Sequence, residues 1–208
     1  MTSSDDSPAL PASRPHCAAC DLPLSTCLCA LVVRADNRVP VLVLQHPREA
    51  REAKGSARLL SRCLARCRVE VGERFEPAAL AAWLHGEGRR SVLLYPSDEP
   101  DAAIPRSVCD FGEADALQLV VLDATWRKSL RLLREHPALA ALPRLGLAPE
   151  HAGRYAPLRR ARRPGQLSTL EATCEALAAL DGDAARYGPV LVAFERFVAD
   201  RVARTRPA

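Results

Sequence analysis

The amino-acid sequence predicts an α/β fold built on a mostly parallel β-sheet. Three short apolar runs are typical of strands buried on both faces, and they span residues 39–44 (VPVLVL), 91–95 (SVLLY) and 118–122 (QLVVL). Segments with helical spacing of apolar residues alternate with these runs, as is typical of parallel sheets. Ligands in such sheets bind beyond the carboxyl ends of the strands, so the polar loops at His46, Ser97 and Asp123 are the expected places for a site.

The remaining elements follow from local patterns. Residues 1–16 lack periodicity, and we expect them to be disordered. The predicted helices span residues 57–66, 77–85, 126–134, 168–180 and about 183 or 189 to 202. Pro77 suits a first helical turn, and Ser168 with Glu171 has the pattern of a capping box. Residues 143–165 show no clear period.

Composition indicates a soluble chain with one core. The 208 residues suffice for one domain with a small accessory unit, and no apolar run approaches the length of a membrane span. The net charge is only +4, but basic residues are clustered. The clusters are Arg48, Arg51, Lys54 and Arg58; Arg127, Lys128, Arg131 and Arg134; and Arg159, Arg160, Arg162 and Arg163. Such clusters commonly lie on solvent-exposed faces of a protein. Three of them in one small domain nevertheless favour a phosphate-bearing partner.

Four cysteines in a C-x-x-C-x6-C-x-C pattern predict a tetrahedral metal site. They are Cys17, Cys20, Cys27 and Cys29. Zinc held by four thiolates has no open position, so such a site is structural. The alternatives are a disulfide or unbound thiols, but no secretory signal precedes the cluster, and closely spaced cysteines in a reducing cytoplasm more often bind metal. We therefore expect a cytoplasmic protein with a zinc knuckle over residues 17–30, followed by one domain over 31–208.

Five short motifs occur in an order that resembles one known family. They are the cysteine cluster, 45–49 (QHPRE), 95–99 (YPSDE), 123–126 (DATW) and 167–172 (LSTLEA). This order, over about residues 17–181, is similar to that of the DTW-domain proteins, whose name matches Asp123, Thr125 and Trp126. Ala124 stands where many relatives have glycine, which changes backbone freedom only slightly.

The resemblance implies both a fold and an activity. It implies a SPOUT-like α/β domain with a C-terminal trefoil knot, although threaded chains are too rare to derive from topology rules. It also implies a tRNA-uridine aminocarboxypropyltransferase. Such an enzyme uses S-adenosylmethionine to place a 3-amino-3-carboxypropyl group on N3 of a uridine in tRNA, forming acp3U and releasing methylthioadenosine.

Candidate roles follow for the motif residues and for the basic clusters. Asp123 is the candidate general base for the N3 proton. The candidate cofactor-binding residues are Pro96, Ser97, Thr125, Trp126, Leu167, Ser168, Thr169 and Glu171. The candidate RNA-binding residues are His46, Arg48, Lys54, Arg58, Arg159 and Arg160. The aromatic content of 4% favours recognition of folded RNA by shape and phosphate contacts over broad base stacking.

Each of these roles has a structural alternative. Asp123 and Thr125 could cap the helix that follows them, and Trp126 could pack into the core. His46 could make a structural hydrogen bond ahead of Pro47. The capping box alone would explain Ser168 and Glu171, although a helix N-terminus could also receive the cofactor carboxylate.

Two other functions remain open at the level of the sequence. One is an RNA methyltransferase that also uses S-adenosylmethionine, and the other is a non-catalytic, zinc-bearing RNA-binding module. The sequence does not separate a monomer from a homodimer, and it does not identify the target uridine.

Overall fold

The computed structural model describes residues 15–96, 111–147, 153–154, 158 and 167–205. The chain separates into two compact units, Met1–Ala30 and Leu31–Ala208. Within the described residues, no helix combines the length and the apolar character needed to cross a membrane.

The first unit is a set of tight turns with two short 3-10 helices, η1 (Leu24–Thr26) and η2 (Cys29–Leu31). The amide of Cys17 donates to the carbonyl of Leu22 at 2.8 Å, and the amide of Asp21 donates to the carbonyl of Cys17 at 2.8 Å. Asp21 has a positive φ of 53°, which aspartate tolerates better than most residues. The turns bring the two halves of the cysteine pattern together.

The second unit is built on a five-stranded parallel sheet, which confirms the predicted fold class. The strands are β1 (Val41–Gln45), β2 (Cys67–Val71), β3 (Arg90–Leu94), β4 (Leu117–Asp123) and β5 (Arg144–Leu145). Their order across the sheet is β2-β1-β4-β3-β5, and every pair is parallel. The three strands predicted from apolar runs are β1, β3 and β4, and β1 and β4 lie in the middle of the sheet.

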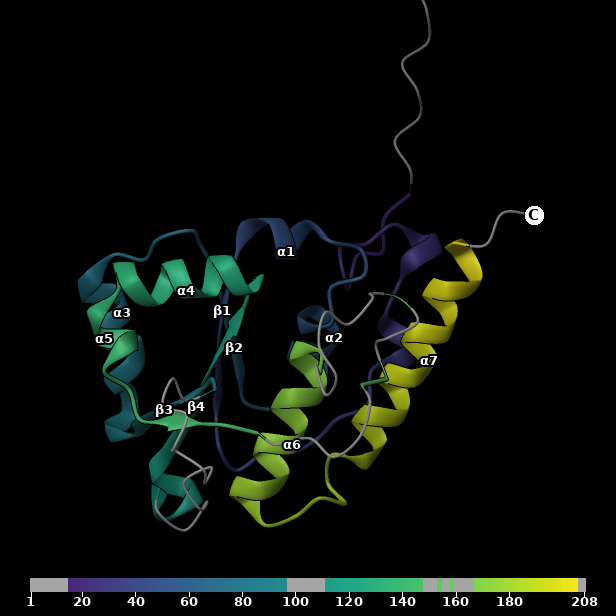
Figure 1. Cartoon of the computed structure of the whole chain (residues 1–208). Coiled ribbons are helices and arrows are strands. Elements are labelled where there is room, and N and C mark those ends of the chain that lie inside the picture. The colour runs from purple at the N-terminus through teal and green to yellow at the C-terminus, as the bar shows by residue number, and fades with distance from the viewer. Residues whose placement is uncertain (1–14, 97–110, 148–152, 155–157, 159–166, 206–208) are drawn as a thin grey trace, which may run out of the picture. The chain divides into compact units, whose positions relative to one another are not determined.

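Helices cover both faces of this sheet (Figure 1). The helices are α1 (Pro47–Arg51), α2 (Ala57–Cys63), α3 (Pro77–His85), α4 (Trp126–Glu135), α5 (Pro137–Ala140), α6 (Thr169–Asp181) and α7 (Gly188–Thr205). One face carries α3, α4 and α5, and the other carries α2, α6 and α7 (Figure 1). The short helix α1 lies at the carboxyl-terminal edge of the sheet, directly after β1.

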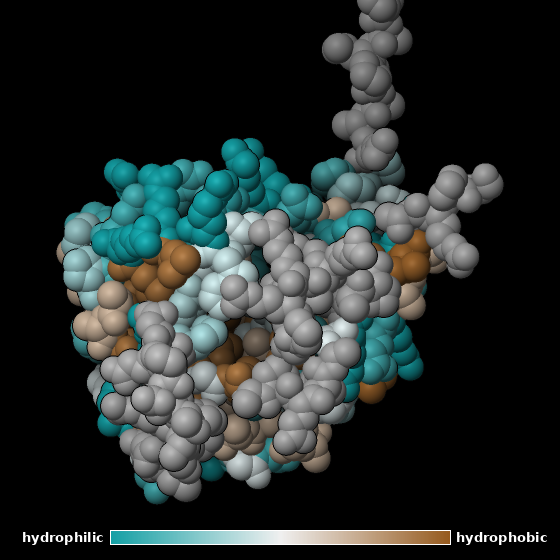
Figure 2. Space-filling model, viewed as in Figure 1, coloured by the Kyte–Doolittle hydropathy of each residue, from teal (hydrophilic) through white to brown (hydrophobic). Residues whose placement is uncertain are grey.

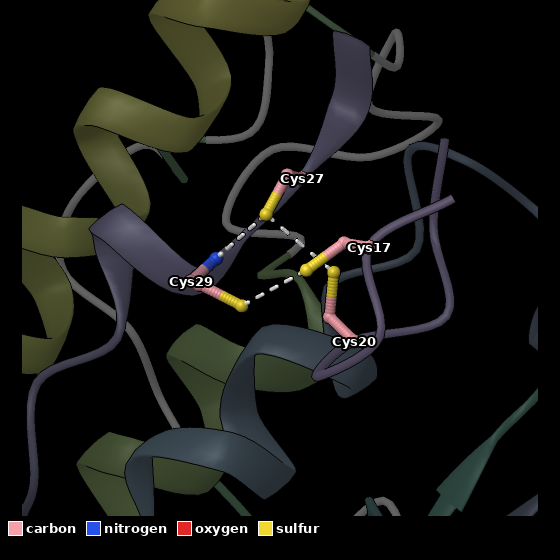
Figure 3. Close-up of side chains that lie close together, drawn as sticks. All are labelled: Cys17, Cys20, Cys27 and Cys29. Carbon is pink, nitrogen blue, oxygen red and sulfur yellow. Dashed lines mark hydrogen bonds between the residues drawn. The ribbon is translucent and has the colours of Figure 1, made fainter. Parts of the chain in front are cut away.

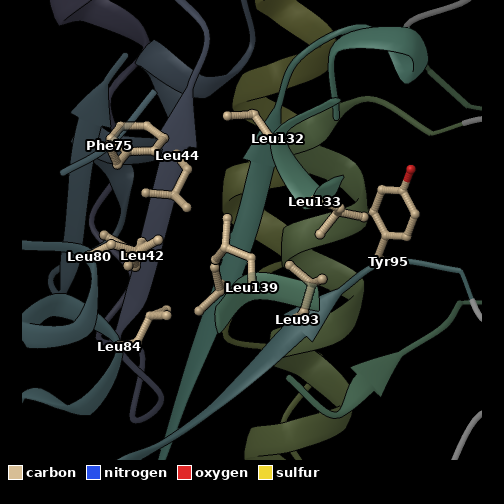
Figure 4. Packing of buried hydrophobic residues seen from close by; sticks show 11 residues of the cluster. Leu42, Leu44, Phe75, Leu80, Leu84, Leu93, Tyr95, Leu132, Leu133 and Leu139 are labelled. Atoms are coloured by element: carbon tan, nitrogen blue, oxygen red, sulfur yellow. The ribbon is translucent and has the colours of Figure 1, made fainter. Parts of the chain in front are cut away.

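One hydrophobic core lies between the sheet and the layer of α3, α4 and α5 (Figure 4). Strand β1 contributes Leu42 and Leu44, and α4 contributes Leu132 and Leu133. Burying such a leucine is worth roughly 1.5–3 kcal/mol. The core therefore fixes where β1 and α4 lie, and with them the loops that follow β1 and precede α4.

Several boundaries differ from those predicted. Strand β1 begins at Val41, two residues late, because Pro40 has no amide to donate to a neighbouring strand. Helix α2 ends at Cys63, because Leu64 is extended with ψ 137°, and the chain then forms β2, which was not predicted. Strand β5 and helices α1 and α5 were also missed. Much of the segment before α6 lies outside the described residues, so the knot and the SPOUT-like assignment stay predictions.

Candidate functional site

The centre of the carboxyl-terminal edge of the sheet is where β1 and β4 meet. Gln45 and Asp123 end these two strands and pair directly in the register. After β1 the chain passes outward to β2, whereas after β4 it passes in the opposite direction to β5. Such a switch point is the usual place for a ligand in a parallel α/β sheet.

The Asp123 carboxylate is held by two side chains from distant parts of the sequence. The Gln45 side-chain amide donates to Oδ2 at 2.8 Å, and the Thr169 hydroxyl donates to Oδ1 at 2.6 Å. Asp123 is 7% exposed. Residue Thr125, not Asp123, occupies the N-cap of α4, and it makes no side-chain capping bond. Asp123 therefore joins β1, β4 and the start of α6, and does not cap α4.

The start of α6 forms the predicted capping box. Ser168 accepts from the Glu171 amide at 3.2 Å, and the Glu171 carboxylate accepts from the Ser168 amide at 2.9 Å. Glu171 is fully buried and also accepts from the Arg154 amide. These contacts account for Ser168 and Glu171 structurally, and they fix Thr169 as the first helical residue.

One amide at the start of α6 has no hydrogen-bond partner in the described part of the chain. The Leu170 amide donates to the Ser56 hydroxyl at 3.4 Å, and the Glu171 amide donates to Ser168. The Thr169 amide has no hydrogen-bond partner among the described residues. The available N–H thus belongs to the same residue whose hydroxyl binds the Asp123 carboxylate.

Aromatic side chains lie beside Asp123 at the start of α4. The Trp126 ring is 46% exposed and meets the Tyr95 ring edge-on, with centroids 5.4 Å apart. The Tyr95 hydroxyl lies 3.2 Å from the Ser129 hydroxyl, and the Arg144 guanidinium lies 5.5 Å from the centre of the Tyr95 ring. Trp126 is therefore not a core residue, and its side chain is partly open to a partner.

His46 is a buried cap rather than an open side chain. Its Nδ1 accepts from the Arg48 amide at 3.1 Å at the start of α1, and its Nε2 lies 3.5 Å from a Glu73 carboxylate oxygen. Burial, followed by the nearby Lys128 ammonium, lowers the pKa of His46 below its usual value. The histidine is thus neutral, with its proton on Nε2, because Nδ1 acts as an acceptor.

The other candidate residues have varied surroundings. Arg48 is exposed, Lys54 is half-buried, and Arg58 donates to the carbonyl of Ala50 at 2.8 Å. Pro96 is exposed, and its carbonyl accepts from Arg144 at 3.3 Å, while Leu167 is half-buried. Ser97, Arg159 and Arg160 lie outside the described residues.

Gln45 is the first residue of the 45–49 motif, but the sequence alone predicted no role for it at this site. Its position at the end of a buried strand, directly before His46, was the available indication. Arg144 was also missed, because it lies in a stretch without a period and belongs to a strand of only two residues.

The four cysteines of the first unit converge on one point (Figure 3). Their sulfur atoms lie within 4.8 Å of one another, and the pairs Cys17–Cys29 and Cys20–Cys27 are 3.7 Å apart. Zinc–sulfur bonds of about 2.3 Å in a tetrahedron place the sulfurs about 3.8 Å apart. None of the four cysteines forms a disulfide in the structure. The cluster could therefore hold a zinc ion.

The electrostatics of the cluster also fit a cation. Hydrogen bonds from the backbone amides of Cys20 and Ala19 lower the pKa of Cys17 to about 6, which favours a thiolate. Hydrogen bonds with Cys27 and Cys17 raise the pKa of Cys29 to about 12, because a second thiolate would face the first. Four thiolates at this spacing need a divalent cation to offset their repulsion.

One known family model matches most of the chain. The DTW domain model matches residues 14–202. No curated protein and no solved structure gave a match. The matched range covers both the cysteine cluster and the edge of the sheet with Asp123, Thr125 and Trp126. The chain therefore belongs to the DTW domain family.

Proposed function

We propose that this protein transfers the 3-amino-3-carboxypropyl group of S-adenosylmethionine to N3 of a uridine in tRNA. Membership of the DTW domain family is consistent with a tRNA-modifying enzyme. The observation that carries the proposal is the Asp123 carboxylate, fixed by Gln45 and Thr169 at the switch point of the sheet. A carboxylate held in this way by two donors is suited to take a proton in one defined direction.

Asp123 would act as the general base. Its two oxygens accept one hydrogen bond each from Gln45 and Thr169, and a carboxylate has about four acceptor positions, so capacity remains for the uridine N3 proton. Removing that proton makes N3 nucleophilic, an effect worth roughly 10²–10⁴-fold in rate. When bound, S-adenosylmethionine supplies the arm on a sulfonium, and methylthioadenosine leaves as N3 takes the arm.

The residues around Asp123 fit a small zwitterionic cofactor. The Thr169 amide points from the N-terminus of α6 and could receive the cofactor carboxylate. The exposed half of Trp126 could stack on the adenine or on a base of the RNA. Pro96 follows β3, Thr125 follows β4 and Leu167 precedes α6, so these three residues are candidates for further cofactor contacts. Ser97 is a candidate from the sequence alone. Ser168 and Glu171 would contribute by holding the turn that presents Thr169.

The other proposed partners are a structural zinc ion and tRNA. Zinc would bind Cys17, Cys20, Cys27 and Cys29, with no position left for a substrate. For tRNA, Arg48 supplies an exposed charge, and Lys54 and Arg58 supply partly covered ones, with Arg159 and Arg160 as further candidates. His46 would act indirectly, by capping α1 and so placing Arg48. We place this reaction in the cytoplasm.

The test is transfer to tRNA from cofactor labelled separately in its methyl group and in its aminocarboxypropyl arm. Label from the arm, and none from the methyl group, is the expected result, and Asp123→Asn should remove nearly all of it. Label from the methyl group alone would identify a methyltransferase instead. Binding of RNA that ignores both the cofactor and Asp123→Asn would identify a non-catalytic module.

A further inference from the structure

The outer face of α4 combines positive charge with exposed apolar surface. Helix α4 carries four basic residues and one carboxylate, a net charge of +3 in ten residues, whereas the whole chain carries +4. Arg127, Arg131 and Arg134 are spaced by four and three residues, so they form one exposed stripe. Trp126 and Leu130, 46% and 40% exposed, form a second stripe beside it. We call these five residues the α4 face.

Among the residues that the structure describes, few negative groups neutralise the α4 face. Arg131 pairs with Glu135 at 2.7 Å, and Arg74 binds the same carboxylate at 3.2 Å, so Glu135 is shared between two cations. Arg127 and Arg134 have no side-chain partner among the described residues. Charges that are solvated and unpaired in this way are free to meet an anionic partner.

The positive surface continues from α4 onto α1. The Lys128 ammonium lies 3.4 Å from His46 Nδ1, at the start of α1, so the two helices begin side by side. Arg48 and Arg51 are exposed on α1. Figure 2 shows strongly hydrophilic surface along the edge where α1 and α4 lie, with apolar surface beside it at α4. Both helices begin at the edge of the sheet that holds Asp123.

We propose that the α4 face is a docking surface for an RNA strand, with the phosphates on the arginine stripe and an unstacked base on Trp126. This inference rests on the proposed function, because it names where the RNA substrate lies. Arg127 and Arg134 are separated by roughly 10 Å along the helix, which spans two or three successive phosphates. Unstacked bases in RNA loops commonly lie on aromatic rings, while arginine holds the backbone.

The position of the two stripes also sets a direction for the RNA. Trp126 is at the end of α4 nearest Asp123, and Arg134 is at the far end. The reactive nucleotide therefore enters at the Trp126 end, and the flanking backbone runs away from Asp123 along the arginine stripe. The uridine that reacts is thus in a loop or single strand, because a paired base would have its N3 proton engaged.

The test compares two double variants with the same change in charge. In Arg127→Gln with Arg134→Gln, we expect the affinity for bulk tRNA to fall about tenfold or more. The slope of log affinity against log salt should fall by about 1–2, since two phosphate contacts are lost. The control, Arg196→Gln with Arg204→Gln, removes two exposed arginines of α7 and should change neither value. Replacing Arg127 and Arg134 by lysine should restore most of the affinity, because phosphate binding needs the charge.

Two further measurements separate this inference from the proposed function. Binding of S-adenosylmethionine should be unchanged in the glutamine double variant, and any transfer activity should show a raised KM for tRNA. Affinity equal to that of the control would overturn the docking surface, even if wild-type protein transfers the arm. If the Arg127→Gln, Arg134→Gln variant loses RNA binding and the α7 control variant keeps it, the docking surface is supported, even if wild-type protein transfers nothing.

Discussion

At the scale of single residues, the feature that organises the site is the pair of donors on Asp123. Thr169 is the better one to test, because valine has the same shape without the hydroxyl. In Thr169→Val we expect the transfer rate to fall about 10- to 100-fold, since Asp123 loses a fixed orientation. The unmet hydrogen bond should also cost about 1–3 kcal/mol of stability. Thr169→Ser keeps the hydroxyl and should retain most of the rate.

The measurement is single-turnover transfer, with binding of S-adenosylmethionine determined separately. A fall in the rate constant with little change in cofactor affinity would mark Thr169 as a positioning residue. If Thr169→Val reacts as fast as wild type, the hydroxyl has no part in orienting Asp123.

The sequence placed Asp123 and Thr169 in separate candidate loops but did not show that they touch. They are 46 residues apart, and Gln45 and Asp123 are 78 residues apart. Motifs name residues one loop at a time, whereas these contacts depend on the order β1-β4 in the sheet and on α6 returning to its edge. The role of Gln45 was missed for that reason, since only the register places its amide against the carboxylate.

At the scale of elements, helix α1 is capped at its N-terminus by His46, whose pKa is lowered in the folded protein. Burial, and then Lys128, lowers the pKa of His46 below 6.5, so the unfolded chain takes up this proton at a higher pH than the folded protein does. The contribution of His46 to stability is therefore present above about pH 6.5 and is lost as the pH falls through the folded pKa. Protonation would also remove the acceptor for the Arg48 amide.

His46→Asn keeps a good N-cap and removes the titration. Urea unfolding between pH 7.5 and pH 5 should show that wild type loses more stability than the variant, by at most about 1.4 kcal/mol per pH unit. The nearby carboxylates of Glu73 and Glu49 act in the opposite sense and reduce this difference. Equal losses in the two proteins would mean that His46 does not titrate differently on folding.

Elements with strong local patterns were predicted better than those set by their neighbours. Helix α3 spans Pro77–His85 as predicted, and α6 begins with the predicted capping box. Strand β2 has the sequence CRVEV and lies at an edge of the sheet, where its residues are partly exposed. Apolar and polar residues therefore alternate in it, and it lacks the continuous apolar run that predicted the buried strands. Strand β5 has only two residues, and pairing with β3 alone defines it.

At the scale of the whole molecule, the cysteine pattern and the edge of the sheet belong to different compact units. The cysteine spacing predicted the cluster well, because all four ligands lie within thirteen residues and turns alone bring them together. The arrangement around Asp123 needs the entire α/β core. We therefore expect that metal removal affects the first unit and leaves the second intact.

Zinc analysis of the full-length protein and its variants tests this separation. We expect one zinc ion per chain in wild type and in Cys67→Ser, because Cys67 lies in β2 and burial raises the pKa of its thiol to about 12. Cys17→Ser should lose the metal. A chelator should increase the hydrogen exchange of backbone amides in residues 17–30, while hydrogen exchange in the sheet and cofactor affinity stay unchanged.

At neutral pH the metal-free protein should be alkylated first at Cys17, whose pKa is about 6, because the thiolate is the reactive form. Equal loss of zinc from Cys17→Ser and Cys67→Ser would refute the assignment. Unfolding of the sheet on chelation would show that the first unit stabilises the second.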